Sequence, residues 1–162
     1  MTVAGGRDRD PTGRPRNARP RDELGRPLPR GATAGPPPPP DVPRDAAASL
    51  RLAEKLLAAG RPFAAHEVLE AAWKRAPALE RDTWRALAQL AVGLTHAQRG
   101  NTAGAVTLLL RAADGLSGTP QLGDETLPTG ALCNWAVDAA AALREDKNNS
   151  LPPMPALQMP PP

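Results

Sequence analysis

The residues best suited to chemistry are His66 and Glu70, which stand four positions apart in an apolar segment. Positions four apart project from the same side of a helix, so an imidazole and a carboxylate would meet there. This spacing suits a divalent metal ion, and it also suits proton transfer between a histidine and a carboxylate. At about 100° per residue, Phe63 and Trp73 fall on the same face as His66. Because a buried ionisable group has to be paired, a site would have to lie on this face.

The segment matches only half of a zinc-protease motif. That motif needs two histidines four positions apart, and Glu70 stands where the second would be, so we do not expect a metalloprotease. The other histidine, His96, could complete a set with His66 and Glu70 if two helices pack as antiparallel neighbours. Gln89 lies two turns from His96 on the same side and could join by hydrogen bonding.

These positions define a candidate pocket for a divalent metal ion or a small ligand. Its residues are His66, Glu70, Gln89 and His96, with Glu67 and Arg85 at the rim, and the metal ligands would be His66, Glu70 and His96. The same residues allow a second interpretation, in which a satisfied polar network fixes the helix register without any reaction. The sequence is therefore compatible with an enzyme and with a non-catalytic protein.

Other prominent residues are expected to be structural. They are the apolar Phe63, Trp73 and Trp84, the helix terminators Gly60 and Gly100, and the helix cap Asn101. The single cysteine, Cys133, excludes an internal disulfide and fits a reducing cytoplasm. The chain contains no Gly-rich phosphate loop, paired-cysteine cluster or serine nucleophile elbow.

Apolar periodicity and turn residues predict an all-α fold, a compact bundle of about five antiparallel helices. The expected helices span about residues 43–59, 62–76, 79–99, 101–116 and 129–144, with a loop over 117–128. A weak echo at a spacing of 40 aligns Gly60, Ala65, Leu69 and Ala72 with Gly100, Ala105, Leu109 and Ala112. This echo makes a tetratricopeptide-like helix pair an alternative architecture.

Proline marks the ends of the folded region. Residues 1–44 hold 11 of the 21 prolines and residues 151–162 hold 6. We therefore expect a disordered Arg/Pro-rich tail over 1–42, a helical domain over 43–147 and a disordered Pro-rich tail over 148–162.

The net charge of +3 is concentrated near the N-terminus, where residues 1–44 carry 9 Arg against 5 Asp and Glu. This distribution does not favour nucleic-acid binding by the folded domain, although a protein partner is compatible with it. No apolar run is long enough to span a membrane, and the N-terminus lacks the apolar stretch of a signal peptide. We therefore expect a cytoplasmic protein with no membrane partner.

The chain resembles a bacterial and archaeal family known as domain of unknown function 309. The resemblance covers about residues 50–116 and rests on an Ala-His-Glu-x-Leu-Glu-x-x-Trp segment, a Gln and a His on the next helix, and a Gly-Asn-x-x-Gly-Ala turn. The matching residues are His66, Glu67, Glu70, Trp73, Gln89, His96, Gly100, Asn101, Gly104 and Ala105. The resemblance implies a compact all-α domain and implies no particular activity.

Two functional hypotheses follow from the sequence. In the first, an inter-helix polar pocket binds a metal ion or small ligand, and any reaction would be hydrolysis assisted by the metal or by His/Glu acid–base chemistry. In the second, the protein is a non-catalytic, tetratricopeptide-like adaptor for a protein partner, and the polar cluster is purely structural.

Overall fold

The computed structural model describes residues 22, 26–29, 41–118, 121–145 and 150–158. Its contacts divide the chain into two units, Met1–Pro38 and Pro39–Pro162, and the helices described below belong to the second. The expected disordered tail over residues 1–42 lies almost entirely outside the described residues, as do several positions of the expected C-terminal tail.

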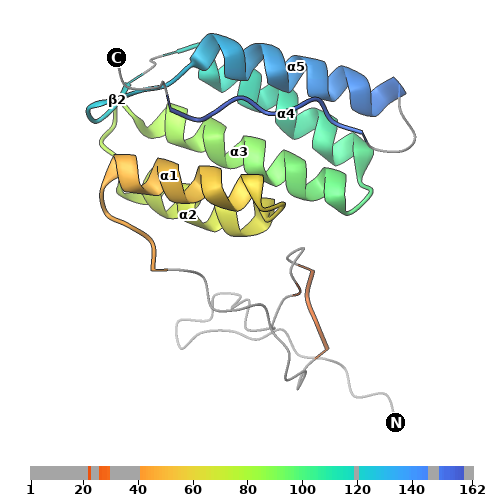
Figure 1. Ribbon diagram of the computed structural model, residues 1–162, viewed down its shortest axis with the longest axis horizontal. Coiled ribbons are helices and arrows are strands. Elements are labelled where there is room, and N and C mark those ends of the chain that lie inside the picture. The colour runs from red at the N-terminus through yellow and green to blue at the C-terminus, as the bar shows by residue number, and fades with distance from the viewer. Residues whose placement is uncertain (1–21, 23–25, 30–40, 119–120, 146–149, 159–162) are drawn as a thin grey trace. The chain divides into compact units, whose positions relative to one another are not determined.

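The described part of the second unit is a bundle of five helices, which confirms the predicted all-α class (Figure 1). The helices are α1 (Ala46–Ala58), α2 (Pro62–Arg75), α3 (Arg81–Gln98), α4 (Thr102–Leu116) and α5 (Thr129–Glu145). Short turns connect the first four helices, and each helix packs against the next along the chain. None of the helices among the described residues is both long enough and apolar enough to cross a membrane.

Side-chain caps and positive-φ glycines set the helix ends. Asp45 caps α1 by accepting a 2.8 Å hydrogen bond from the backbone N–H of Ala48. Gly60, at φ +70°, ends the helix, and the Arg61 N–H then reaches back to the carbonyl of Leu56 at 2.9 Å. This geometry is a Schellman motif, which satisfies carbonyls that the helix end would otherwise leave unpaired. At the other end, the Asp45 cap makes residue 46 the first helical residue of α1, whereas the sequence predicts a start at about residue 43.

The core is built almost wholly from leucine and alanine, as the low aromatic content predicts. Helices α3 and α4 approach closely because two glycines stand at their seam. A Cβ on Gly115 would lie 2.8 Å from the Cβ of Ala86, and one on Gly93 would lie 3.1 Å from Cγ of Leu109. Close packing at this seam makes α3 and α4 the centre of the bundle.

The segment between α4 and α5, for which the sequence predicts a loop, contains a short β-hairpin. Strand β1 (Gln121–Leu122) pairs antiparallel with β2 (Glu125–Thr126) across a turn in which Gly123 has φ +61°. The Gly123 N–H donates to Oε1 of Glu80 at 2.8 Å, so the hairpin is tied to the start of α3. The buried Leu122 and Leu127 then place its apolar side in the core.

Residues 150–158, which we call the C-terminal strap, contain no helix or strand, yet they lie against the bundle (Figure 1, dark blue). Burial along the strap follows a period of three. Ser150, Pro153 and Ala156 are exposed, whereas Leu151 and Met154 are half-buried and Leu157 is only 1% exposed. A period of three is typical of an extended polyproline II chain, which turns once every three residues.

Candidate functional site

His66 and Glu70 come from successive turns of α2, and their geometry is that of neighbours without a tight bond. His66 Nε2 lies 3.7 Å from Oε2 of Glu70, beyond ordinary hydrogen-bond distance. The other carboxylate oxygen of Glu70 forms a 3.0 Å ion pair with Nζ of Lys74. The carboxylate therefore has a permanent cationic partner, and its closest ion pair does not involve the histidine.

The surroundings of the His66 imidazole lower its pKa and so disfavour its protonated form. Burial lowers its pKa, the Glu70 carboxylate acts in the opposite direction, and Lys74 lowers the pKa further. Its Nδ1 is buried and has no hydrogen-bond partner among the described residues. The ring of Phe63 lies beside the imidazole, with 6.1 Å between the ring centroids. Nδ1 is therefore shielded from solvent, whereas the His66 side chain as a whole is 23% exposed.

The face of α2 that carries His66 is not the face that packs into the core. The fully buried positions of α2 are Ala65, Val68, Leu69 and Ala72, which point to one side of His66. Phe63 and Trp73, which we expected to be core residues, are only half-buried and flank the polar pair. The largest apolar side chains of α2 therefore do not mark its buried face, which carries smaller residues.

His96 lies in the last turn of α3, next to the connection to α4. Its Nδ1 lies 2.9 Å from Nδ2 of Asn101, and Oδ1 of Asn101 accepts the Gly104 N–H at 3.0 Å. Asn101 thus caps α4 and binds the histidine at the same time. A Cβ on Gly104 would lie 2.5 Å from Asn101 Nδ2, so the turn needs glycine there. The network explains why these residue types occur together at this spacing.

The remaining pocket candidates do not complete a polar site. Gln89 is half-buried and makes no hydrogen bond to His66 or Glu70 among the described residues. Arg85 is exposed and pairs with Asp82 at 3.1 Å on its own helix, and Glu67 is half-buried. Across the described ranges, no three His, Cys, Asp or Glu side chains gather as a set that could hold a metal ion. The expected three-ligand set of His66, Glu70 and His96 is therefore not assembled.

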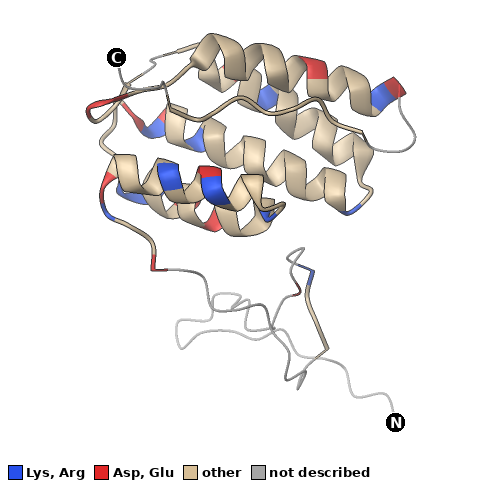
Figure 2. Ribbon diagram, viewed as in Figure 1, with Lys and Arg blue, Asp and Glu red and all other residues tan. Residues whose placement is uncertain are grey.

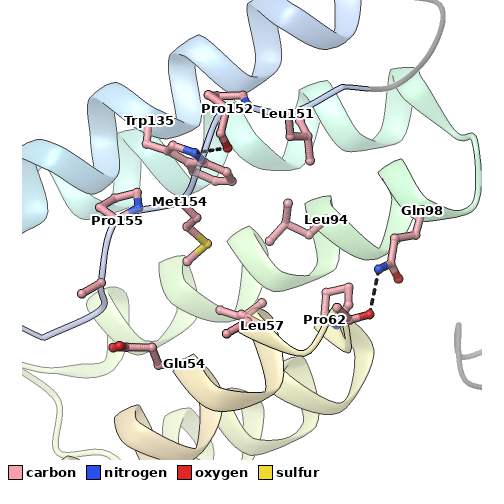
Figure 3. Close-up of a pocket in the computed structure, with 13 residues that line it drawn as sticks. Glu54, Leu57, Pro62, Leu94, Gln98, Trp135, Leu151, Pro152, Met154 and Pro155 are labelled. Carbon is pink, nitrogen blue, oxygen red and sulfur yellow. Dashed lines mark hydrogen bonds between the residues drawn. The ribbon is translucent and has the colours of Figure 1, made fainter.

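A larger site lies between the helices and the C-terminal strap (Figure 3). It is a cavity of about 480 Å³ bounded by α1, the start of α2, α3, α5 and the strap. The lining residues are Glu54, Leu57, Ala58, Gly60, Pro62, Leu94, Gln98, Trp135, Leu151, Pro152, Met154, Pro155 and Ala156. Most of these side chains are apolar, and in Figure 2 the strap carries neither an acidic nor a basic residue.

Three hydrogen bonds hold the strap in place. Nε1 of Trp135 donates to the Pro152 carbonyl at 3.0 Å, and the Leu157 N–H donates to Oε2 of Glu54 at 3.0 Å. At the far end, Nε2 of Gln158 donates to Oε2 of Glu125 at 2.6 Å. Two of these bonds recognise the main chain of the strap rather than its side chains. The helices therefore bind an extended peptide by contacts that many sequences could make.

Over residues 50–108 the chain matches the model of a family described as Domain of unknown function (DUF309). This stretch is a DUF309 region. The resemblance inferred from the sequence is thereby confirmed, and its limits are informative. The DUF309 region runs from α1 into α4 and includes the His66–Glu70 pair and the His96–Asn101 turn, but it stops before α5 and the strap. Neither a curated protein nor a solved structure matches the chain.

The strap and the cavity were missed by the sequence analysis, although both lie beside the DUF309 region. One signal could have found them. Leu151, Met154 and Leu157 recur every three residues in a proline-rich segment, which would place them on one side of an extended helix. A tail without this period would have no apolar side to bury. Proline content alone predicts disorder, and only the spacing of the apolar residues indicates that this segment can dock.

Proposed function

We propose that the helical domain is a non-catalytic binding module for an extended, proline-containing peptide of a partner protein. The binding site is the groove formed by α1, α3 and α5, in which the strap now lies. One observation carries the proposal: the bundle already holds a peptide of this chemistry, whose main chain bonds to Trp135 and Glu54 and whose Leu157 is buried. The peptide ligand would carry apolar side chains at every third position, as Leu151, Met154 and Leu157 do.

The contacts of the strap support this type of recognition. Proline-rich peptides bind in aromatic grooves because an extended polyproline II chain loses little entropy on binding. Here an indole N–H from Trp135 meets the carbonyl of Pro152, and a carboxylate from Glu54 meets the N–H of Leu157. These two main-chain groups of the strap therefore exchange their bonds to water for bonds to the bundle. The three apolar positions then supply most of the buried surface.

The strap is joined to α5 by a few residues, so it competes with any peptide that arrives from solution. A short tether gives an effective concentration on the order of millimolar, and a partner must overcome that competition. Weakening the strap should therefore raise the apparent affinity of the groove for a free peptide. A variant with a weakened strap should therefore be compared with the wild-type protein.

The test uses a fluorescein-labelled peptide with the sequence of residues 150–158 and follows its anisotropy. The full-length protein carrying Leu157→Asp should bind this peptide at least about 10-fold more tightly than the wild-type protein, because the tethered competitor is weakened. Leu79→Asp serves as the matched control, since Leu79 is 90% exposed.

A second substitution identifies the groove as the binding site. Adding Trp135→Phe to the Leu157→Asp protein keeps an aromatic ring but removes the indole N–H, and should weaken peptide binding about 5-fold or more. The proposal is wrong if the peptide does not bind to the Leu157→Asp protein while its helices remain folded by circular dichroism. Equal binding with and without the indole N–H would place the peptide elsewhere.

A further inference from the structure

The strap fills its groove incompletely. Beneath it remains the cavity of about 480 Å³, within the range of about 300–1,000 Å³ that is typical of small-molecule sites. Figure 3 shows Leu57, Leu94 and Met154 extending into this space from α1, α3 and the strap. This pocket is partly open to solvent, so it is a concave site at the surface rather than a void in the packed interior.

The polar groups at the edge of the cavity are already engaged. Gln98 Nε2 donates to the Gly60 carbonyl at 2.8 Å, the Trp135 indole donates to Pro152, and Glu54 accepts the Leu157 N–H. A ligand in the cavity would therefore meet mainly leucine, proline, methionine and indole surface. A concave, mainly apolar pocket suits an apolar guest, because binding removes apolar surface of both from water. The unbranched side chain of Met154 can adjust to guests of different shape.

We propose that this cavity is a binding site for a small, uncharged apolar molecule, and that the bound molecule holds the strap against the helices. The first half follows from the apolar lining. The second follows from the origin of the walls, because Leu151, Pro152, Met154, Pro155 and Ala156 belong to the strap itself.

Such a ligand contacts both the strap and the helices, so it binds the closed arrangement and loses half of its site when the strap leaves. A ligand that prefers one state shifts the equilibrium towards it by its differential affinity. At a concentration of 100 times its dissociation constant, it would favour the closed state by up to about 100-fold, and by less to the extent that it also binds the open state. The consequence for a partner peptide rests on the proposed function: the bound apolar ligand would keep the strap in the groove and so prevent the peptide from binding there. The ligand site itself does not depend on that function.

The test uses N-phenylnaphthylamine, an uncharged apolar fluorophore whose emission rises in an apolar site, with the full-length protein. The wild-type protein should bind the fluorophore, and Leu94→Trp, which fills the cavity, should weaken binding at least about 10-fold. Val137→Trp is the matched control, because Val137 lies on α5 and is 48% exposed. Leu57→Trp fills the same cavity from α1 and replaces Leu94→Trp if that variant does not fold.

Hydrogen exchange tests the closure. Saturating fluorophore should slow exchange of the Leu157 amide, which is bonded to Glu54, and leave the Gly104 amide, which is bonded to Asn101, unchanged. Equal fluorophore affinity in the Leu94→Trp and Val137→Trp proteins, or no binding to the wild type, would overturn the ligand site. Binding without slower exchange at Leu157 would overturn the closure.

The peptide titration described above, performed without fluorophore, separates the two proposals. Peptide binding without fluorophore binding leaves only the proposed function standing, and the reverse leaves only the ligand site.

Discussion

Replacing Leu157 with alanine should release the strap while the helices stay folded. Leu157 is the strap residue with the least exposure, at 1%, and it sits beside the backbone hydrogen bond to Glu54. The substitution removes three buried carbons and leaves that hydrogen bond chemically intact. It therefore isolates the contribution of apolar burial to strap docking.

The magnitude follows from the buried carbons. At about 0.8 kcal/mol for each buried carbon, the loss is about 2.4 kcal/mol. A buried leucine in a rigid core would lose more, because a cavity would remain. The strap is free on its outer side and can move inward, so the smaller figure applies here. A loss of about 2.4 kcal/mol raises the population of the open strap about 50-fold.

The indole N–H of Trp135 reports on the open strap directly, because it is bonded to the Pro152 carbonyl only while the strap is docked. Its exchange with solvent, followed by NMR, should be about 50-fold faster in the Leu157→Ala protein than in the wild type. Leu79→Ala makes the same chemical change at a residue that is 90% exposed and should leave the rate unchanged. An unchanged indole rate in Leu157→Ala would refute the assignment of Leu157 as the anchor of the strap.

Four further predictions test other parts of the structure. His66→Gln should reduce the loss of stability that the wild-type protein shows on acidification below pH 6.5. Burial lowers the His66 pKa from that value, so below it the unfolded chain binds more protons than the folded protein does. Urea titrations at several pH values will show whether the loss persists in the variant. The wild-type and His66→Ala proteins should have the same metal content by elemental analysis, because no three-ligand set is assembled among the described residues; a lower content in the variant would restore a metal site on α2. Asn101→Ala should cost about 1 kcal/mol through the lost cap of α4, measured by urea denaturation, and an unchanged midpoint would contradict the cap. Gly115→Ala should cost about 1–3 kcal/mol because its Cβ meets Ala86 at 2.8 Å, whereas the control Gly130→Ala has nothing within 4 Å and should be neutral.

The bundle could be predicted from the sequence because its signals are local. Pro62 opens α2, Gly60 and Gly100 end α1 and α3 at positive φ, and Asn101 caps α4. Each signal acts within a few residues and needs no knowledge of the partner helix. The hairpin after α4 was missed because its support, Glu80, lies 43 residues away in the chain.

The candidate site was predicted less well, for a physical reason. Spacing along a helix shows that His66 and Glu70 are neighbours, but it does not show which side of the helix is covered. Two of the four residues on the covered side are alanines, Ala65 and Ala72, and alanine gives a weak signal in any hydrophobic pattern. His96 was expected to face His66, yet the short-range bond to Asn101 holds it in its own turn. A polar residue five positions away was available without any tertiary packing.

The bond between the Leu157 amide and Glu54 has a kinetic consequence. It joins residues 103 positions apart, so the entropy cost of closing this loop is offset only after α1 has folded and can accept the bond. The strap should therefore dock after the rate-limiting step of folding. Contacts that are absent from the transition state slow unfolding and leave the folding rate nearly unchanged. The docked strap would then lengthen the lifetime of the native state, and release of the strap at Leu157 would be the first step in the unfolding of the bundle.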